Sequence, residues 1–372
     1  MRRRRFLTGV TGVAAATVGW GLGTGTAVAA PGAREAAGWG QVTVPTGQPA
    51  SRLTRVAAVS TELAWAVGES GRNGTTPGTP LALRWDGDQW TELDLGHLDF
   101  EGPLTQLAAS SPESAWALGG EGESSHLLRW EGDSWRETAF PDSTRAGTRL
   151  IGLAVADDGT VWASGERDGR YALLRGTDGT FEWLDPLPED SGTPYQVRVG
   201  PAGAVWVSGD VIARWDQGSW TVLPQPEGIR QGIGDLLAPA PDDVWVVGAS
   251  FGVGGPPDKP TSAVFSHWDG TGWTDLTEGL PFRVGGLYAM IGDADHRPDL
   301  VVGWDFWDGH RTHYLRRDGD DWVSERGPDA GTQTPMMRHL AAVPGTDQIW
   351  SVGSDSRYST SPPALARVER YG

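Results

Sequence analysis

A five-residue phrase, AWAVG, recurs with small changes along the whole chain. Each copy is a short run of apolar β-formers that ends in glycine, a composition typical of a strand buried on both faces. The copies lie roughly 40 to 55 residues apart, which is the spacing of large structural repeats. The seven copies are Ala64–Gly68, Ala115–Gly119, Val161–Gly165, Val205–Gly209, Val244–Gly248, Asp299–Gly303 and Ile349–Gly353.

A second phrase, LRWDGDQW, follows most copies of the first. Its two aromatic-flanked runs surround Asp-Gly, a strong signal for the tight turn of a β-hairpin. A further apolar run, such as RVAAVS at Arg55–Ser60, precedes each AWAVG. Copies of the second phrase are Leu83–Trp90, Leu128–Trp135, Ala213–Trp220, Ser266–Trp273 and Leu315–Trp322, with a looser one at Leu174–Trp183.

One repeat therefore holds four strands. Seven such repeats predict an all-β fold, a seven-bladed β-propeller of four-stranded antiparallel blades that spans residues 39–372 as one domain. The last repeat stops after its third strand at Ala366–Gly372, whereas Trp39–Pro45 matches the fourth-strand pattern. We expect this N-terminal strand to complete the last blade and leave no open edge. A β-solenoid is the alternative, although its rungs are usually shorter.

The N-terminus has the features of an export signal. Four arginines (Arg2–Arg5) precede an apolar, Gly/Ala-rich region that ends in a small-x-small cleavage pattern at Ala27–Ala29. Residues 1–29 are interpreted as a twin-arginine signal peptide, with a general secretory signal as the alternative, and residues 30–38 as a flexible lead-in. The absence of cysteine excludes disulfides and thiol chemistry. We expect a secreted protein.

Charge limits the classes of partner. The formal net charge is −18, which argues against nucleic acid and anionic membranes. No apolar stretch after the signal is long enough to span a bilayer, so we expect a soluble monomer after signal cleavage. The sequence does not specify a cofactor.

The rim loops offer one candidate site. In a four-stranded meander, the loops that join strands two and three lie on the same rim as the loops that join one blade to the next. In this sequence those loops are long and irregular, which favours ligand binding on that rim. Most tryptophans recur in step with the blades and are interpreted as packing. Two that do not could stack on a sugar or an aromatic ligand, with polar neighbours to orient it, or they could fold over the next blade as a lid. This candidate platform comprises Trp304, Trp307, Asp305, Asp308, His310 and Arg311.

The channel mouth offers a second candidate site. Aligning the innermost strands brings Arg55, Asp235 and His339 to one level, with Tyr288 nearby and Arg198 two places further along its strand. These residues supply an acid, a base and cations in one funnel. The alternative is a structural polar ring that closes the channel with bridging waters.

Other chemistries find no support. The chain has no phosphate-binding loop, zinc-protease motif or nucleophile elbow. Only His310 and His313 are close enough in sequence to suggest a metal pair, and the acidic turns do not follow calcium-loop spacing. No metal site is predicted.

The repeat W-x-x-G…R-W-D-G-x-x-W resembles the propeller repeats grouped as WD-type, YVTN and BNR (Asp-box), from Trp39 to the C-terminus. The hairpin is usually one residue shorter than an Asp-box and lacks its leading Ser/Thr. The resemblance implies the fold rather than one function. Some polysaccharide lyases use seven-bladed propellers with His, Tyr and Arg as base, acid and carboxylate clamp. That similarity implies these roles for His339, Tyr288 and Arg55.

Two functions follow as hypotheses. The first is a secreted binding propeller that recognises a glycan or a surface protein through its variable rim. The second is a secreted carbohydrate-active enzyme, a polysaccharide lyase or glycoside hydrolase, with its site at the channel mouth. A structural envelope protein is a third alternative.

Overall fold

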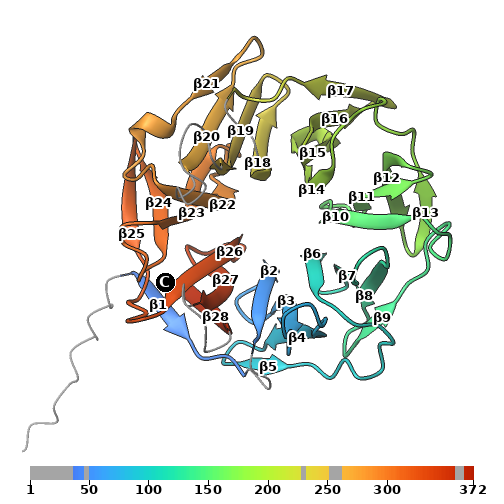
Figure 1. Cartoon of the computed structure of the whole chain (residues 1–372), viewed down its shortest axis with the longest axis horizontal. Coiled ribbons are helices and arrows are strands. Elements are labelled where there is room, and N and C mark those ends of the chain that lie inside the picture. Colours follow the sequence, from blue (N-terminus) through green and yellow to red (C-terminus); the bar gives the residue numbers. More distant parts are fainter. Residues whose placement is uncertain (1–36, 46–49, 228–231, 251–261, 357–363) are drawn as a thin grey trace, which may run out of the picture. The chain divides into compact units, whose positions relative to one another are not determined.

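The computed structural model describes residues 37–45, 50–227, 232–250, 262–356 and 364–372. Within Gly38–Gly372, seven four-stranded antiparallel sheets follow one another around a ring (Figure 1). The predicted seven-bladed β-propeller is confirmed. The predicted signal peptide and most of the lead-in lie outside the described residues.

The blades follow chain order, each running from the innermost strand outward. Blades 1 to 4 are β2 (Arg52–Ala58), β3 (Ala64–Ser70), β4 (Thr79–Trp85), β5 (Trp90–Glu92); β6 (Leu104–Ser111), β7 (Ser114–Gly119), β8 (His126–Trp130), β9 (Trp135–Glu137); β10 (Arg149–Val155), β11 (Val161–Arg167), β12 (Arg170–Thr177), β13 (Thr180–Trp183); and β14 (Pro194–Val199), β15 (Val205–Gly209), β16 (Ile212–Asp216), β17 (Ser219–Leu223). Blades 5 to 7 are β18 (Ile233–Ala240), β19 (Asp243–Ser250), β20 (Ser262–Trp268), β21 (Trp273–Asp275); β22 (Gly285–Gly292), β23 (Pro298–Asp305), β24 (His313–Asp318), β25 (Asp321–Arg326); and β26 (Thr334–Ala342), β27 (Ile349–Ser356), β28 (Leu365–Tyr371), β1 (Trp39–Val42). Two single-turn 3₁₀ helices are Pro201–Gly203 and Thr277–Gly279.

The N-terminal strand closes the ring, as the incomplete last repeat predicts. β1 pairs antiparallel with β28, with Trp39 opposite Tyr371 and Val42 opposite Val368. The Trp39 ring also stacks on Tyr314 of the sixth blade, with ring centroids 3.4 Å apart. The two ends of the described ring therefore share one sheet, and blade 7 has all four strands.

The hydrophobic core lies between the blades. Seven clusters of buried side chains occur in the described ring, and each joins residues of two neighbouring blades. The tryptophans of the repeat supply much of this packing. For example, Trp65 of blade 1 meets Trp130 and Trp135 of blade 2 edge to face. Because every blade buries its faces against its neighbours, the channel itself is free to carry polar side chains.

The Asp-Gly hairpins form as their sequence predicts. In the first, the Asp86 Oδ1 atom accepts hydrogen bonds from the backbone N–H groups of Asp88 and Gln89, at 3.0 and 2.9 Å. Gly87 has a φ of 100°, a conformation that favours glycine. These turns join the outer strands on one rim, opposite the irregular loops.

Every innermost strand contains a β-bulge near its start, where one residue is skipped in the pairing with the second strand. The skipped residues are Thr54, Thr105, Ile151, Tyr195, Gly234, Tyr288 and Arg338. The residues that follow them form a ring of equivalent positions, the post-bulge ring: Arg55, Gln106, Gly152, Gln196, Asp235, Ala289 and His339.

The rims follow from this topology. The irregular loops lie on the rim where the innermost strands begin, here called the loop rim, and the Asp-Gly turns lie on the hairpin rim. Parts of two predicted loop-rim insertions, residues 251–261 and 357–363, lie outside the described residues. In the described part of the chain, no helix is long and apolar enough to cross a membrane.

Candidate functional site: the channel mouth

The post-bulge ring brings together most of the residues that the sequence analysis aligned. Arg55, Asp235 and His339 occupy equivalent positions opposite the second strands of their blades. In blade 6 the equivalent residue is Ala289, which pairs with Val302, so the alignment near Leu287 and Tyr288 is off by one or two residues. Tyr288 is instead the bulge residue, one step closer to the loop rim.

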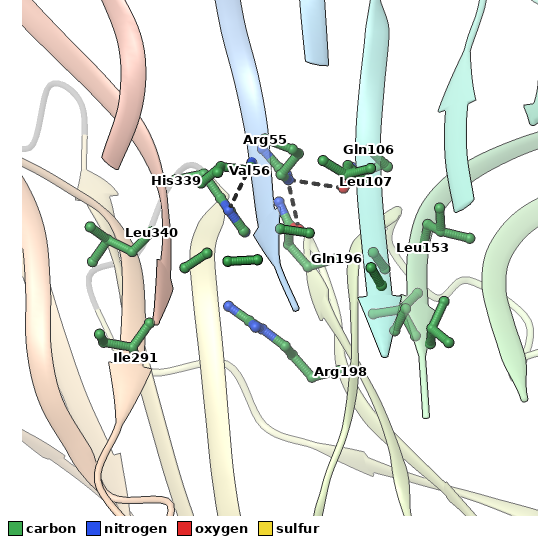
Figure 2. A pocket seen from close by; sticks show the side chains of 18 of the residues that line it. Arg55, Val56, Gln106, Leu107, Leu153, Gln196, Arg198, Ile291, His339 and Leu340 are labelled. Atoms are coloured by element: carbon green, nitrogen blue, oxygen red, sulfur yellow. Dashed lines mark hydrogen bonds between the residues drawn. The ribbon is translucent and has the colours of Figure 1, made fainter. Parts of the chain in front are cut away.

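Arg55 spans the channel at this level (Figure 2). Its Nε donates to Oε1 of Gln106 and its Nη2 donates to Oε1 of Gln196, both at 3.0 Å. The Nη1 group donates to the backbone carbonyl of Thr54 at 2.9 Å. All these acceptors are neutral, so the hydrogen bonds orient the guanidinium without neutralising it. Burial lowers the pKa of Arg55 to about 10; the carboxylate of Asp235 opposes this shift and nearby arginines add to it.

Asp235 is fully engaged by its neighbours. Arg198 binds it in a bidentate pair, Nε to Oδ1 at 3.0 Å and Nη2 to Oδ2 at 2.6 Å. The same two oxygens accept the backbone N–H groups of Leu236 and Met290, at 2.9 and 2.8 Å. Although burial alone would lower it, the carboxylate raises the pKa of Arg198. The pair is a structural brace across blades 4, 5 and 6.

His339 is neutral at ordinary pH. Its Nδ1 accepts the backbone N–H of Val56 at 3.4 Å, as Figure 2 shows. Burial, together with the positive charges of Arg55 and Arg198, lowers the pKa of His339 well below its usual value of 6.5. A neutral ring that accepts at Nδ1 carries its proton on Nε2. The remaining ring nitrogen is therefore a hydrogen-bond donor.

A hollow of about 530 Å³ lies on the loop-rim side of this layer. Three arginines line it, Arg52, Arg55 and Arg338, together with Tyr288 and the hydroxyls of blade 7. Arg52 is neutralised by the buried carboxylate of Glu69 at 2.8 Å. In contrast, Arg55 and Arg338 make no ion pair within the described residues. We call this hollow the rim pocket.

Tyr288 and Arg338 face each other across two blades. The Arg338 guanidinium lies 4.7 Å from the centre of the Tyr288 ring, in a cation–π arrangement. Tyr288 is half-buried and Arg338 is exposed. Both are bulge residues, and their position above the post-bulge ring places them at the wall of the rim pocket.

The second predicted site is only partly assembled. Trp304 is 6% exposed whereas Trp307 is 78% exposed, so the two rings do not form one flat platform. They are linked through Phe306, which meets both rings nearly edge on, at 84° and 87°. Trp304 is buried at the end of β23, whereas Trp307 is exposed to solvent.

The polar residues of that segment mostly bind one another. Asp308 pairs with Arg326 at 2.7 Å, and Arg311 pairs with Asp329 at 3.1 Å. Asp305 Oδ1 accepts the backbone N–H of Trp307 at 3.0 Å, and His310 is exposed. These contacts stabilise the loop. The structure places Arg198, the remaining predicted ligand-binding residue, in the channel rather than near this loop.

The described residues contain no group of three or more His, Cys, Asp or Glu side chains that could hold a metal ion. His313 lies within β24 and binds Ser324 and Asp308, at 2.8 and 3.4 Å.

No family model matches the chain, and no curated protein matches it. Solved structures do match. A catalytically inactive variant of virginiamycin B lyase from Staphylococcus aureus, with quinupristin, has a TM-score of 0.61 at 14% identity, covering 91% of this chain and 100% of its own. YCF48 bound to D1 peptide gives 0.59 at 15%, covering 91% and 98%. The WD40 propeller of Doa1 gives 0.52 at 13%, covering 89% and 97%.

These similarities show the fold alone, since all the identities are low. The chain is a seven-bladed β-propeller that shares its architecture with both a lyase and binding propellers. Its channel residues therefore have to be interpreted from their own contacts.

Sequence reasoning missed Arg52, Arg338 and the two serines of blade 7 that line the rim pocket, Ser354 and Ser356. Arg338 immediately precedes His339, and the alternation of a regular strand would point it away from the channel. The bulge changes that direction. The apolar pattern alone contains no signal for the skipped residue.

Proposed function

We propose that this protein is a secreted binding propeller that retains an anionic glycan in the rim pocket. The observation that carries this proposal is the pair of unneutralised guanidiniums, Arg55 and Arg338, at one hollow of a protein whose formal net charge is −18. None of the described residues that line this pocket carries a carboxylate. A local excess of positive charge in an acidic protein favours an anionic ligand at that place.

The other lining residues suit a sugar. Tyr288 offers part of an aromatic face, and the hydroxyls of Ser354 and Ser356 can donate to or accept from ring hydroxyls. Arginine binds carboxylates and sulfates in bidentate geometry, which gives orientation as well as affinity. Polysaccharides that contain uronate or sulfate offer an anionic group for the arginines, hydroxyls for the serines and a sugar ring for the aromatic face. An acidic segment of a surface protein would share only the charge.

The contacts favour binding over catalysis. Asp235 has both oxygens occupied by Arg198 and by backbone donors, so it has no free role as a general acid or base. His339 would have to lose its contact with Val56 to offer Nδ1 as a base. Arg55 and Arg338 can still orient a ligand as donors.

Retention of the full chain on immobilised polysaccharides tests this proposal. We expect retention on polygalacturonate or heparin and none on a neutral polymer such as dextran. Arg338→Gln should weaken binding about tenfold, the effect of losing one charged hydrogen bond. Arg136→Gln, which makes the same charge change on the exposed outer strand β9, is the matched control.

Equal loss in both variants would show that only net charge matters and would contradict a site in the rim pocket. Binding to acidic peptides but to no polysaccharide would replace the glycan with a surface protein. Retention that Arg338→Gln leaves unchanged would move the site away from the channel mouth, and Trp307→Ala would then test the exposed aromatic loop.

A further inference from the structure

A second hollow lies on the other side of Arg55. It has a volume of about 310 Å³ and is lined by residues of the innermost strands of six blades, from the post-bulge ring toward the hairpin rim. Arg55 belongs to the lining of both hollows and separates them. We call this second hollow the channel chamber. Its size is at the lower end of the range for small-molecule sites.

Four small side chains create the chamber. Two residues beyond the post-bulge ring, blades 7, 1, 2 and 3 carry alanine, whereas blades 4, 5 and 6 carry long side chains. Each of these seven residues pairs with the equivalent residue of the second strand in its own blade. In the order of the blades just given, the seven are Ala341, Ala57, Ala108, Ala154, Arg198, Leu237 and Ile291. The hollow therefore lies against blades 7, 1, 2 and 3, which are neighbours in the ring. Arg198 extends toward it from blade 4.

The loop-rim end of the chamber is polar and positively charged. Arg55 and Arg198 extend into the channel at successive levels, with His339 beside Arg55 (Figure 2). The pair with Asp235 uses Nε and Nη2 of Arg198, and Nη1 lies outside it. Arg198 keeps 34% of its side chain exposed. Among the residues that the structure describes, no Asp or Glu belongs to the lining.

The rest of the chamber wall is apolar and opens to solvent. Ala57, Ala108 and Ala341 are half-buried, and Ala342 at the end of β26 is exposed. Water can satisfy the charged end, but the alanine wall offers it no hydrogen-bond partner. Polar groups at one end and an apolar wall along the side are the usual composition of a small-molecule site.

We propose that the channel chamber is a second ligand site, which binds a small organic carboxylate with an apolar body. The carboxylate takes hydrogen bonds from Arg55, from Nη1 of Arg198 and from Nε2 of His339. The apolar body lies against the alanines and displaces water from them. An inorganic anion would accept hydrogen bonds from the same donors but would leave the alanine wall in contact with water. This site is separate from the rim pocket and does not depend on the glycan proposal.

Titration calorimetry on the full chain tests the proposal with phenylacetate and hexanoate as probes. We expect saturable binding of at least one carboxylate, and binding of its amide, phenylacetamide or hexanamide, at least tenfold weaker. Ala341→Leu should weaken carboxylate binding at least tenfold by filling the chamber. The fold accommodates such a side chain, because blades 5 and 6 carry Leu237 and Ile291 at the equivalent position.

Arg136→Gln serves as the control for charge and handling, since Arg136 lies on the exposed outer strand β9 and lines neither hollow. It should leave probe binding unchanged. Ala108→Leu replaces Ala341→Leu if thermal unfolding shows that the latter is misfolded.

Four results would overturn the proposal. Without saturable binding of either carboxylate, the polar ring is only structural. With amide and carboxylate bound equally, the arginines do not recognise the ligand. With binding reduced by Arg338→Gln but not by either leucine variant, the probe occupies the rim pocket. Competition by chloride or phosphate at equal concentration would likewise show a site for any anion.

Discussion

At the scale of single residues, the channel uses charge in two ways. Arg198 is neutralised by a carboxylate that is itself held by two backbone donors, so that pair braces three blades. Arg55 is held by neutral amides and keeps its charge available. Arg198 therefore braces the blades through Nε and Nη2 and has only Nη1 outside the pair, whereas the Arg55 guanidinium is not paired with a carboxylate of any described residue.

The pH dependence of stability tests the environment of His339. Because its pKa is lowered in the folded state, the unfolded chain binds the proton more tightly as pH falls below 6.5. The contribution of the neutral ring to the free energy of unfolding thus has its full value above about pH 6.5. It decreases progressively as the pH falls below that value. His339→Gln should remove about 1–2 kcal/mol of the stability difference between pH 7 and pH 5.

Chemical denaturation at the two pH values measures this difference, and all other titrating groups cancel between wild type and variant. Identical pH dependence in the two proteins would mean that His339 titrates normally. Neither the burial of the ring nor the positive charges of Arg55 and Arg198 would then act on His339 as described.

At the scale of elements, one local device explains both the repeated phrase and the site. The glycine that ends each AWAVG copy pairs with the residue just before the bulge of the innermost strand, as Gly68 pairs with Leu53. A side chain there would collide with backbone: a Cβ atom on Gly68 would meet the carbonyl oxygen of Arg52, and one on Gly353 that of Met336. The glycine permits the bulge, and the bulge turns the post-bulge residue into the channel.

Replacing this glycine should therefore be costly. We expect Gly68→Ala to lower the free energy of unfolding by about 2–4 kcal/mol, because the backbone of two paired strands must shift. Gly272→Ala is the matched control, since a Cβ atom at Gly272 meets nothing within 4 Å. Denaturant unfolding monitored by tryptophan fluorescence compares them. Equal, small effects in the two variants would show that the close approach at the bulge is tolerated.

This device also defines how far the sequence predicts the site. Arg55, Asp235 and His339 can be aligned because each lies 9 or 10 residues before the start of an AWAVG copy. The sixth repeat reads GGLYAMIG, whose apolar residues do not mark the bulge, so the sequence places this blade only near Leu287 and Tyr288 and does not identify Ala289. Side-chain pairing, such as Arg198 with Asp235, depends on rotamers and on channel width, which a repeat pattern does not contain.

At the scale of the whole molecule, the repeat predicts nearly all of the fold. Seven strand-hairpin units, an incomplete last unit and a matching N-terminal strand require a closed ring, and β1 on β28 confirms this closure. The seven interfaces between blades carry the hydrophobic core. The repeat predicts much less about function. The blades keep their packing, while each blade contributes a different residue to the channel.

The central claim is that the channel mouth binds and does not catalyse. One measurement tests it directly: the full chain is incubated with the acidic polysaccharide that retains it, and absorbance of unsaturated products is followed together with new reducing ends. We predict retention without products at any time point. Products that disappear in His339→Ala would contradict this account and make the protein a carbohydrate-active enzyme.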